Sequence, residues 1–150
     1  MRTLWKKITM ALVLLGTVTA LSGVAIAQSC SNASLNGNYV FTIHGQILAG
    51  PAPGIVDGIA LSTFDGQGKM TQVDTVSHNG QVAQVWRPGT ATYAVNPDCT
   101  GSMTLDNQGV PPLHLVFLID KQAKSIHTVV IDPGVAVTSD ATRQEGPDGP

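Results

Sequence analysis

Charged side chains are scarce in this chain of 150 residues, because eight lysines and arginines and ten aspartates and glutamates make up only 12% of it. The basic residues form no cluster in the mature part of the chain. Proteins that bind nucleic acid need lysine and arginine to replace the counterions at phosphates, and docking on anionic membranes needs the same residues. The composition therefore argues against nucleic acid as a partner and against electrostatic attachment to membranes.

Residues that carry chemistry are also few, with two cysteines, four histidines and a single glutamate near the C-terminal end. No two histidines have the His-x-x-x-His spacing of a zinc site, and the Cys-x-x-Cys-His motif of c-type haem is missing. Gly-x-Ser-x-Gly, P-loop and dinucleotide-binding motifs do not occur either. The sequence predicts no metal site and no cofactor, and it leaves open whether the protein is an enzyme, with the balance against it.

The first 27 residues have the layout of a secretory signal peptide. Arg2, Lys6 and Lys7 form a positive start, an uncharged and largely apolar stretch follows, and Ala25-Ile26-Ala27 fits the small-x-small cleavage rule. The alternative is an uncleaved membrane anchor, since the apolar stretch is just long enough to span a bilayer. We expect cleavage after Ala27, which would release a bacterial periplasmic or secreted protein without stable membrane insertion.

The mature chain is expected to form one domain over residues 28–142, followed by a flexible tail over 143–150. Cleavage removes three of the eight basic residues and none of the ten acidic ones, so the mature net charge is about −5. A chain of this length can bury its own core. The tail, RQEGPDGP, contains no large apolar residue that would anchor it.

Short runs of alternating apolar and polar residues fill this domain, and Gly, Pro, Asn and Asp separate them. No amphipathic helix is predicted. Residues 78–80 (His-Asn-Gly) are expected to form a hairpin turn that exposes His78, and residues 87–89 (Arg-Pro-Gly) to interrupt the sheet. The run at 113–119 is nearly all apolar, which predicts a strand covered on both faces. The expected strands are 39–44, 55–64, 70–77, 82–86, 90–95, 102–105, 113–119, 126–131 and 135–142.

The connections between these runs are mostly short, which is typical of an antiparallel meander. Closing a meander into a barrel removes its exposed edges. We therefore predict an all-β fold, a small antiparallel up-and-down barrel of about eight to nine strands. The alternative is a β-sandwich, which usually needs longer crossovers. A membrane barrel is disfavoured, because most runs are shorter than the roughly 9–11 residues that its strands need.

Cys30 and Cys99 are the only cysteines, 69 positions apart. In an exported protein two cysteines most simply form one disulfide. A catalytic cysteine would need a nearby base and electropositive surroundings, whereas Asp98 beside Cys99 disfavours a thiolate. We predict a Cys30–Cys99 disulfide that ties the mature N-terminus to the turn after Val95.

Three segments of the chain carry recognisable motifs: CSNASLNGNYVFTIHG (30–45), LSTFDGQGKMT (61–71) and GTATYAVNPDCTGSMTL (89–105). They resemble a group of uncharacterised secreted bacterial proteins that share, in order, Cys…Ser-Leu-x-Gly-x-Tyr-x-Phe, Phe-Asp-Gly-x-Gly and Gly-Thr-x-Tyr-x-Val-x-x-Asp-Cys-Thr-Gly. The third segment departs from this pattern by one residue, because two residues separate Thr90 from Tyr93. The resemblance implies a calycin-like or allene-oxide-cyclase-like barrel. Its matching residues are turn, strand-core and cysteine positions, and a fold alone does not assign a function.

Two functions are compatible with such a barrel. In the first, the barrel binds a small apolar molecule or serves as a structural module of the cell envelope. The candidate pocket residues are Phe41, His44, Trp86, Tyr93, His114 and Phe117, although the aromatic ones would equally well fill a core. In the second, a cofactor-free cyclase or isomerase would need polar groups that converge in an apolar cavity. The candidates for that role are His44, His114, Asp57 and Asp74, although solvent-facing positions are favoured for both aspartates.

Overall fold

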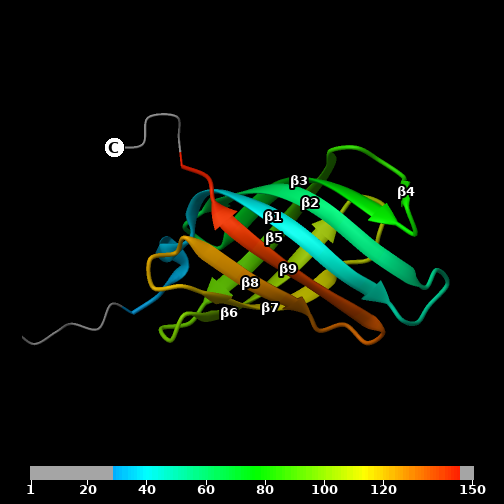
Figure 1. Ribbon diagram of the computed structural model, residues 1–150. Helices are drawn as coiled ribbons and strands as arrows, with labels where there is room; N and C mark the ends of the chain where they lie inside the picture. The colour runs from blue at the N-terminus through cyan, green and yellow to red at the C-terminus, as the bar shows by residue number, and fades with distance from the viewer. Residues whose placement is uncertain (1–28, 146–150) are drawn as a thin grey trace, which may run out of the picture.

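The computed structural model describes residues 29–145, which form one short 3₁₀ helix and nine β-strands (Figure 1). The predicted signal peptide and residues 146–150 of the predicted tail lie outside the described residues. The elements are η1 (Asn32–Ser34), β1 (Asn36–Ile47), β2 (Gly54–Asp65), β3 (Lys69–His78), β4 (Gln81–Val82), β5 (Arg87–Val95), β6 (Thr100–Asn107), β7 (Leu113–Ile119), β8 (Ser125–Val130) and β9 (Val135–Arg143).

The strands form a single antiparallel sheet that closes on itself. Their order is β2-β1-β9-β8-β7-β6-β5-β3-β4, and an additional pairing of β2 with β3 completes the ring. Eight strands therefore make up the barrel. The two-residue β4 pairs with the last residues of β3, on the same side of β3 as β5. The predicted all-β up-and-down barrel is confirmed, and the sandwich alternative does not apply.

Side chains alternate between the interior and the solvent along the barrel strands, because successive residues of a strand point to opposite faces. In β7, for example, Leu115 and Phe117 are buried, whereas Val116 and Leu118 are exposed. The prediction that this strand is covered on both faces is wrong, since the wall of this barrel has a core on one side only.

One end of the barrel is filled by aromatic rings and covered by the segment around η1. Leu35 and Tyr39 are fully buried, and the ring of Phe64 packs edge-on against those of Tyr39 and Tyr93, with centroids 5.3 and 5.2 Å away. The hydroxyl of Tyr93 donates to the carbonyl of Leu35 at 3.0 Å. Burial raises the pKa of both tyrosines. We call this the closed end; its turns are 65–68, 96–99 and 120–124.

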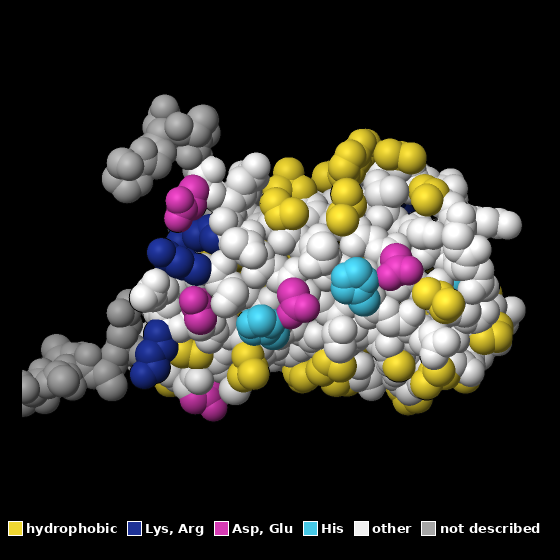
Figure 2. All heavy atoms as spheres, in the orientation of Figure 1, with side chains coloured by type: hydrophobic (Ala, Val, Ile, Leu, Met, Phe, Trp, Pro, Cys, Tyr) yellow, Lys and Arg dark blue, Asp and Glu magenta, His cyan; other side chains and the backbone are white. Residues whose placement is uncertain are grey.

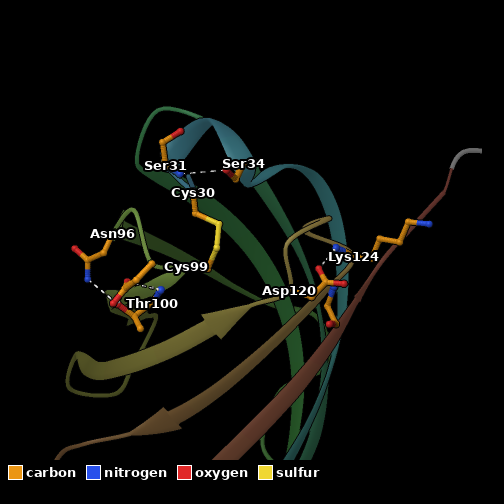
Figure 3. Close-up of a disulfide and its surroundings, with 10 residues drawn as sticks. Cys30, Ser31, Ser34, Asn96, Cys99, Thr100, Asp120 and Lys124 are labelled. Carbon is orange, nitrogen blue, oxygen red and sulfur yellow. Dashed lines mark hydrogen bonds between the residues drawn. A yellow bond between two sulfur atoms is a disulfide. The ribbon is translucent and has the colours of Figure 1, made fainter. Parts of the chain in front are cut away.

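The predicted disulfide between Cys30 and Cys99 lies at the closed end, with the two Cα atoms 5.0 Å apart (Figure 3). Beside it, the N–H of Cys30 donates to the carbonyl of Pro97 at 3.2 Å. The N–H of Val95 donates to the side-chain oxygen of Asn32 at 2.8 Å. These bonds hold the N-terminal segment over the core at this end.

The chain leaves the sheet between β4 and β5. β4 ends at Val82, residues 83–86 bulge outward, and β5 begins at Arg87 opposite Asp74. Trp86 has a φ of +52°, a left-handed conformation that bulky residues rarely adopt. The prediction of a strand at 82–86 with an interruption at Arg-Pro-Gly is therefore wrong, because the interruption comes first and the Arg-Pro-Gly segment starts the next strand.

Candidate functional site

The interior at the end opposite the disulfide is partly accessible to solvent. Six of its inward-facing apolar side chains are half-buried, although Val56 and Val130 at this end are buried. By contrast, residues such as Leu35, Phe64 and Ile126 at the closed end are fully buried. We call this the open end; its connections are 48–53, 79–86, 108–112 and 131–134. The half-buried apolar residues that line it are Ile43, Ile47, Val76, Leu105, Leu113 and Val135.

A buried polar cluster lies inside the barrel, centred on Asp74, which is 1% exposed. Nε of Arg87 donates to one oxygen of this carboxylate at 3.1 Å, and a terminal guanidinium nitrogen donates to the other at 2.9 Å. The side-chain amides of Gln72 and Asn107 donate to the same carboxylate at 3.3 and 3.2 Å. Ser62 donates to Gln72 at 3.2 Å. A buried charge is costly without partners, and this one has four donors.

The strand pattern explains why these polar side chains point inward. Gln72 and Asp74 are in phase with the buried Met70 on β3, so the pleat turns them toward the interior. On the adjacent strands β5 and β6, Gly89 is paired with Asn107, and a Cβ atom at position 89 would collide with the side-chain amide of Asn107. The absence of a side chain at Gly89 therefore leaves room for Asn107 to reach the cluster.

The cluster is formally neutral and is reached by solvent from its arginine side. It pairs one guanidinium with one carboxylate, and the side chain of Arg87 is 18% exposed whereas that of Asp74 is 2% exposed. Because Asp74 already neutralises Arg87, the cluster offers polar groups without a net charge that would attract an ion.

His78 supplies a second polar group nearer the open end. It is the last residue of β3, opposite the buried Val56, and it lies on the same inward face as Asp74. The two residues lie four positions apart along the strand, which corresponds to about 13 Å. The Nε2 atom of His78 is buried and has no hydrogen-bond partner among the described residues. A buried polar atom without a partner costs roughly 1–3 kcal/mol, so a hydrogen-bonding group brought to it would be stabilised.

The six residues predicted for a pocket divide between the two faces of the barrel wall. Phe41, Tyr93 and Phe117 point inward and are buried. His44 and His114 are exposed on the outer wall, and Trp86 is exposed in the outward bulge 83–86. The structure therefore brings the three buried aromatic residues into the core and leaves the other three outside it.

The four polar residues considered for a cyclase do not converge. Nδ1 of His44 lies 3.0 Å from Asp57 on the outer wall, and Nδ1 of His114 lies 2.8 Å from Asp132, also outside. Only Asp74 faces the interior, so the expectation that it faces solvent is wrong, whereas Asp57 is exposed as expected. Figure 2 shows histidine and carboxylate side chains next to one another on one outer face. Within residues 29–145, no three histidine, cysteine or carboxylate groups are placed to hold a metal ion.

Sequence reasoning missed Arg87, Gln72 and Asn107, and it placed His78 in an exposed turn. The turn consists of Asn79 and Gly80, which have positive φ angles of 51° and 79°, so His78 remains in the strand. One signal was present in the sequence, because Gln72 and His78 have the same even-numbered phase as the apolar Met70.

A shallow depression of about 370 Å³ also lies on the outer wall, over β5, β6 and β7. Thr92, Ser102, Thr104 and His114 are among its lining residues. Its polar side chains are exposed, and they hold no buried group that lacks a partner. It is a less convincing site than the open end.

Comparisons with models of known protein families, with curated proteins and with solved structures found no match to this chain. In the part of the chain that the structure describes, no helix has the length and apolar character needed to cross a membrane. A function must therefore be derived from the geometry of the barrel.

Proposed function

We propose that this protein is an exported β-barrel that binds a small, mainly apolar molecule at the open end of its interior. The observation that carries the proposal is that six inward-facing apolar side chains near the open end are half-buried, whereas the aromatic-filled closed end holds the fully buried Leu35, Tyr39 and Phe64. Covering apolar surface contributes roughly 25 cal/mol per Å², and a barrel of eight strands is large enough for one small ligand. A small number of polar groups in a mainly apolar lining is typical of such sites.

The polar groups favour an uncharged ligand with one hydrogen-bonding group. A carboxylate brought to Arg87 would have to share the guanidinium with Asp74, which already makes two hydrogen bonds to it. A hydroxyl group fits better beside Nε2 of His78, because it can donate or accept according to which ring nitrogen carries the proton. We therefore expect an alcohol or phenol with an apolar body rather than a fatty acid.

Export is supported by the disulfide and by the predicted signal peptide. Disulfides form and persist in oxidising compartments such as the bacterial periplasm and the extracellular space. The resemblance to secreted bacterial proteins is in keeping with this location. The cyclase alternative lacks support, because three of its four candidate residues lie on the outer wall.

The test is a calorimetric titration of the exported protein with 1-decanol and with decanoate. We expect one molecule of decanol to bind per chain, and decanoate to bind about tenfold more weakly, as the loss of one hydrogen bond would predict. Leu113→Gln, at a half-buried inward position of β7, should weaken decanol binding. Leu118→Gln, on the outer face of the same strand, is the matched control and should not. The absence of saturable binding, or an equal effect of both variants, would contradict the proposal.

A further inference from the structure

Large apolar side chains are exposed at every connection of the open end and at none of the turns 65–68, 96–99 and 120–124 of the closed end, where Leu118 on β7 is the exposed one that comes within two residues of a turn. Seven such residues lie in or beside the connections β1–β2, β3–β5, β6–β7 and β8–β9, and their exposures range from 42% to 62%. We call them the apolar rim. The rim residues are Leu48, Ile55, Val82, Val85, Trp86, Val110 and Ile131.

Charge is distributed in the opposite way. The four connections of the open end contain one charged residue, Asp132, and the exposed Asp106 lies beside the connection β6–β7. Asp132 accepts a hydrogen bond from the backbone N–H of His114 at 2.7 Å and pairs with the ring of His114 at 2.8 Å. The basic residues of the described chain outside the buried cluster all lie at the closed end: Lys69, Lys121, Lys124 and Arg143. In Figure 2 nearly all visible lysine and arginine side chains lie at the left, and the right-hand end shows hydrophobic ones. The barrel is thus amphipathic along its axis.

We propose that the apolar rim docks this barrel on the surface of an uncharged or zwitterionic lipid layer, with the open end facing the lipid. Exposed apolar side chains gain free energy when they leave water. Tryptophan is favoured at the boundary between lipid and water, where its ring is partly apolar and its N–H can stay hydrated. The rim carries no lysine or arginine, so the attraction does not rely on anionic lipid headgroups.

A fluid lipid surface suits the rim better than a second copy of the chain does. The rim residues belong to four separate connections around the end of the barrel, with glycine- and proline-rich segments such as 49–54 between them. A stable protein interface needs about 1,000 Å² of well-packed, complementary surface. Lipid adapts to separate protruding side chains. Two uncharged rims would also offer each other no complementary charges.

This inference concerns the outer tips of the connections and does not require that the interior binds a ligand. It does connect with that proposal, because an apolar molecule could then pass between the lipid and the open end without crossing water. The two are separable by experiment, since the rim variants below leave all inward-facing residues unchanged.

The test is co-flotation of the exported protein with phosphatidylcholine vesicles. We expect the wild type to float with them, and neither anionic lipid in the vesicles nor high salt should change the bound fraction more than twofold. The double variant Val85→Ser/Trp86→Ser should lower the bound fraction at least tenfold. The matched control Val116→Ser/Leu118→Ser, which removes two exposed apolar residues from the outer face of β7, should not.

Two readouts make the result decisive. Trp86 is the only tryptophan in residues 28–150, so its fluorescence should shift to the blue when wild-type protein meets the vesicles. Circular dichroism checks that each variant is folded. Failure of the wild type to float, flotation only with anionic vesicles and loss in salt, or an equal loss in the wall variant would overturn the proposal. Rim-dependent dimerisation without vesicle binding would overturn it in favour of a second copy.

Discussion

The buried carboxylate of Asp74 would lose its counter-ion if Arg87 were replaced by methionine, which keeps an extended apolar side chain and removes the charge. Asp74 is 1% exposed and accepts two of its four hydrogen bonds from Arg87. Removing one partner of a buried ion pair costs about 3–5 kcal/mol. Because Gln72 and Asn107 still donate to the carboxylate, we expect Arg87→Met to lower the free energy of unfolding by about 3 kcal/mol, at the lower end of that range.

Replacing the other partner should lower the free energy of unfolding less. In Asp74→Asn the guanidinium of Arg87 loses its partner, but this side chain is 18% exposed and can reach water. We therefore expect Asp74→Asn to lower the free energy of unfolding by about 1–2 kcal/mol. The double variant should cost less than the sum of the two, because neither charge is then left buried alone. Asp140→Asn is the control: it breaks a pair with His127 that is exposed on the outer wall, and it should cost under about 0.5 kcal/mol.

These free energies are measured by urea denaturation followed by circular dichroism, with the disulfide kept oxidised. Equal m-values across the variants would show that stability rather than compactness has changed. If Arg87→Met proved no more harmful than Asp140→Asn, the buried cluster described here would be wrong.

Three further predictions concern the closed end and the core. Thiol titration of the non-reduced protein should find no free thiol, and two reactive thiols would refute the disulfide. Replacing both Cys30 and Cys99 by serine should lower the free energy of unfolding by about 4 kcal/mol, because the disulfide closes a loop of roughly 70 residues. Gly101→Val should destabilise by about 1–3 kcal/mol in urea denaturation, since its Cβ would collide with the ring of Phe117, and a neutral effect would contradict that packing. Backbone N–H groups that donate to Asp65 lower its pKa below the usual 3.8, so the unfolded chain takes up this proton first and stability falls as the pH drops below about 4. Asp65→Asn should make the urea midpoint less dependent on pH in that range, and an unchanged acid profile would count against those hydrogen bonds.

The fold was largely predictable because alternation of apolar and polar residues, punctuated by turn residues, reports strands directly. The predicted strand 113–119 coincides with β7, and the two cysteines pair as expected. The same apolar run led to the wrong prediction that both faces of this strand are buried. Val116 and Leu118 are hydrophobic yet exposed, and a run of apolar residues does not reveal how many faces of a strand are covered.

The candidate site was harder to predict, because it depends on strand register. Asp74 meets Arg87 only because residues 83–86 bulge out of the sheet, which sets the pairing of β3 with β5. Proline and glycine next to Arg87 suggest a turn, yet proline is tolerated at the start of a strand and glycine where a neighbouring side chain approaches closely. The phase of Asp74 relative to Met70 was the one local sign that this aspartate points inward.

Ligand binding at the open end is tested most directly by NMR of isotope-labelled protein of residues 28–150 during titration with 1-decanol. We predict saturable chemical-shift changes at Ile43, Val76 and Leu113 and at the ring nitrogens of His78, with Tyr39 at the closed end unchanged. Shifts confined to the outer depression around Thr104, or no saturable shifts at all, would contradict binding at the open end.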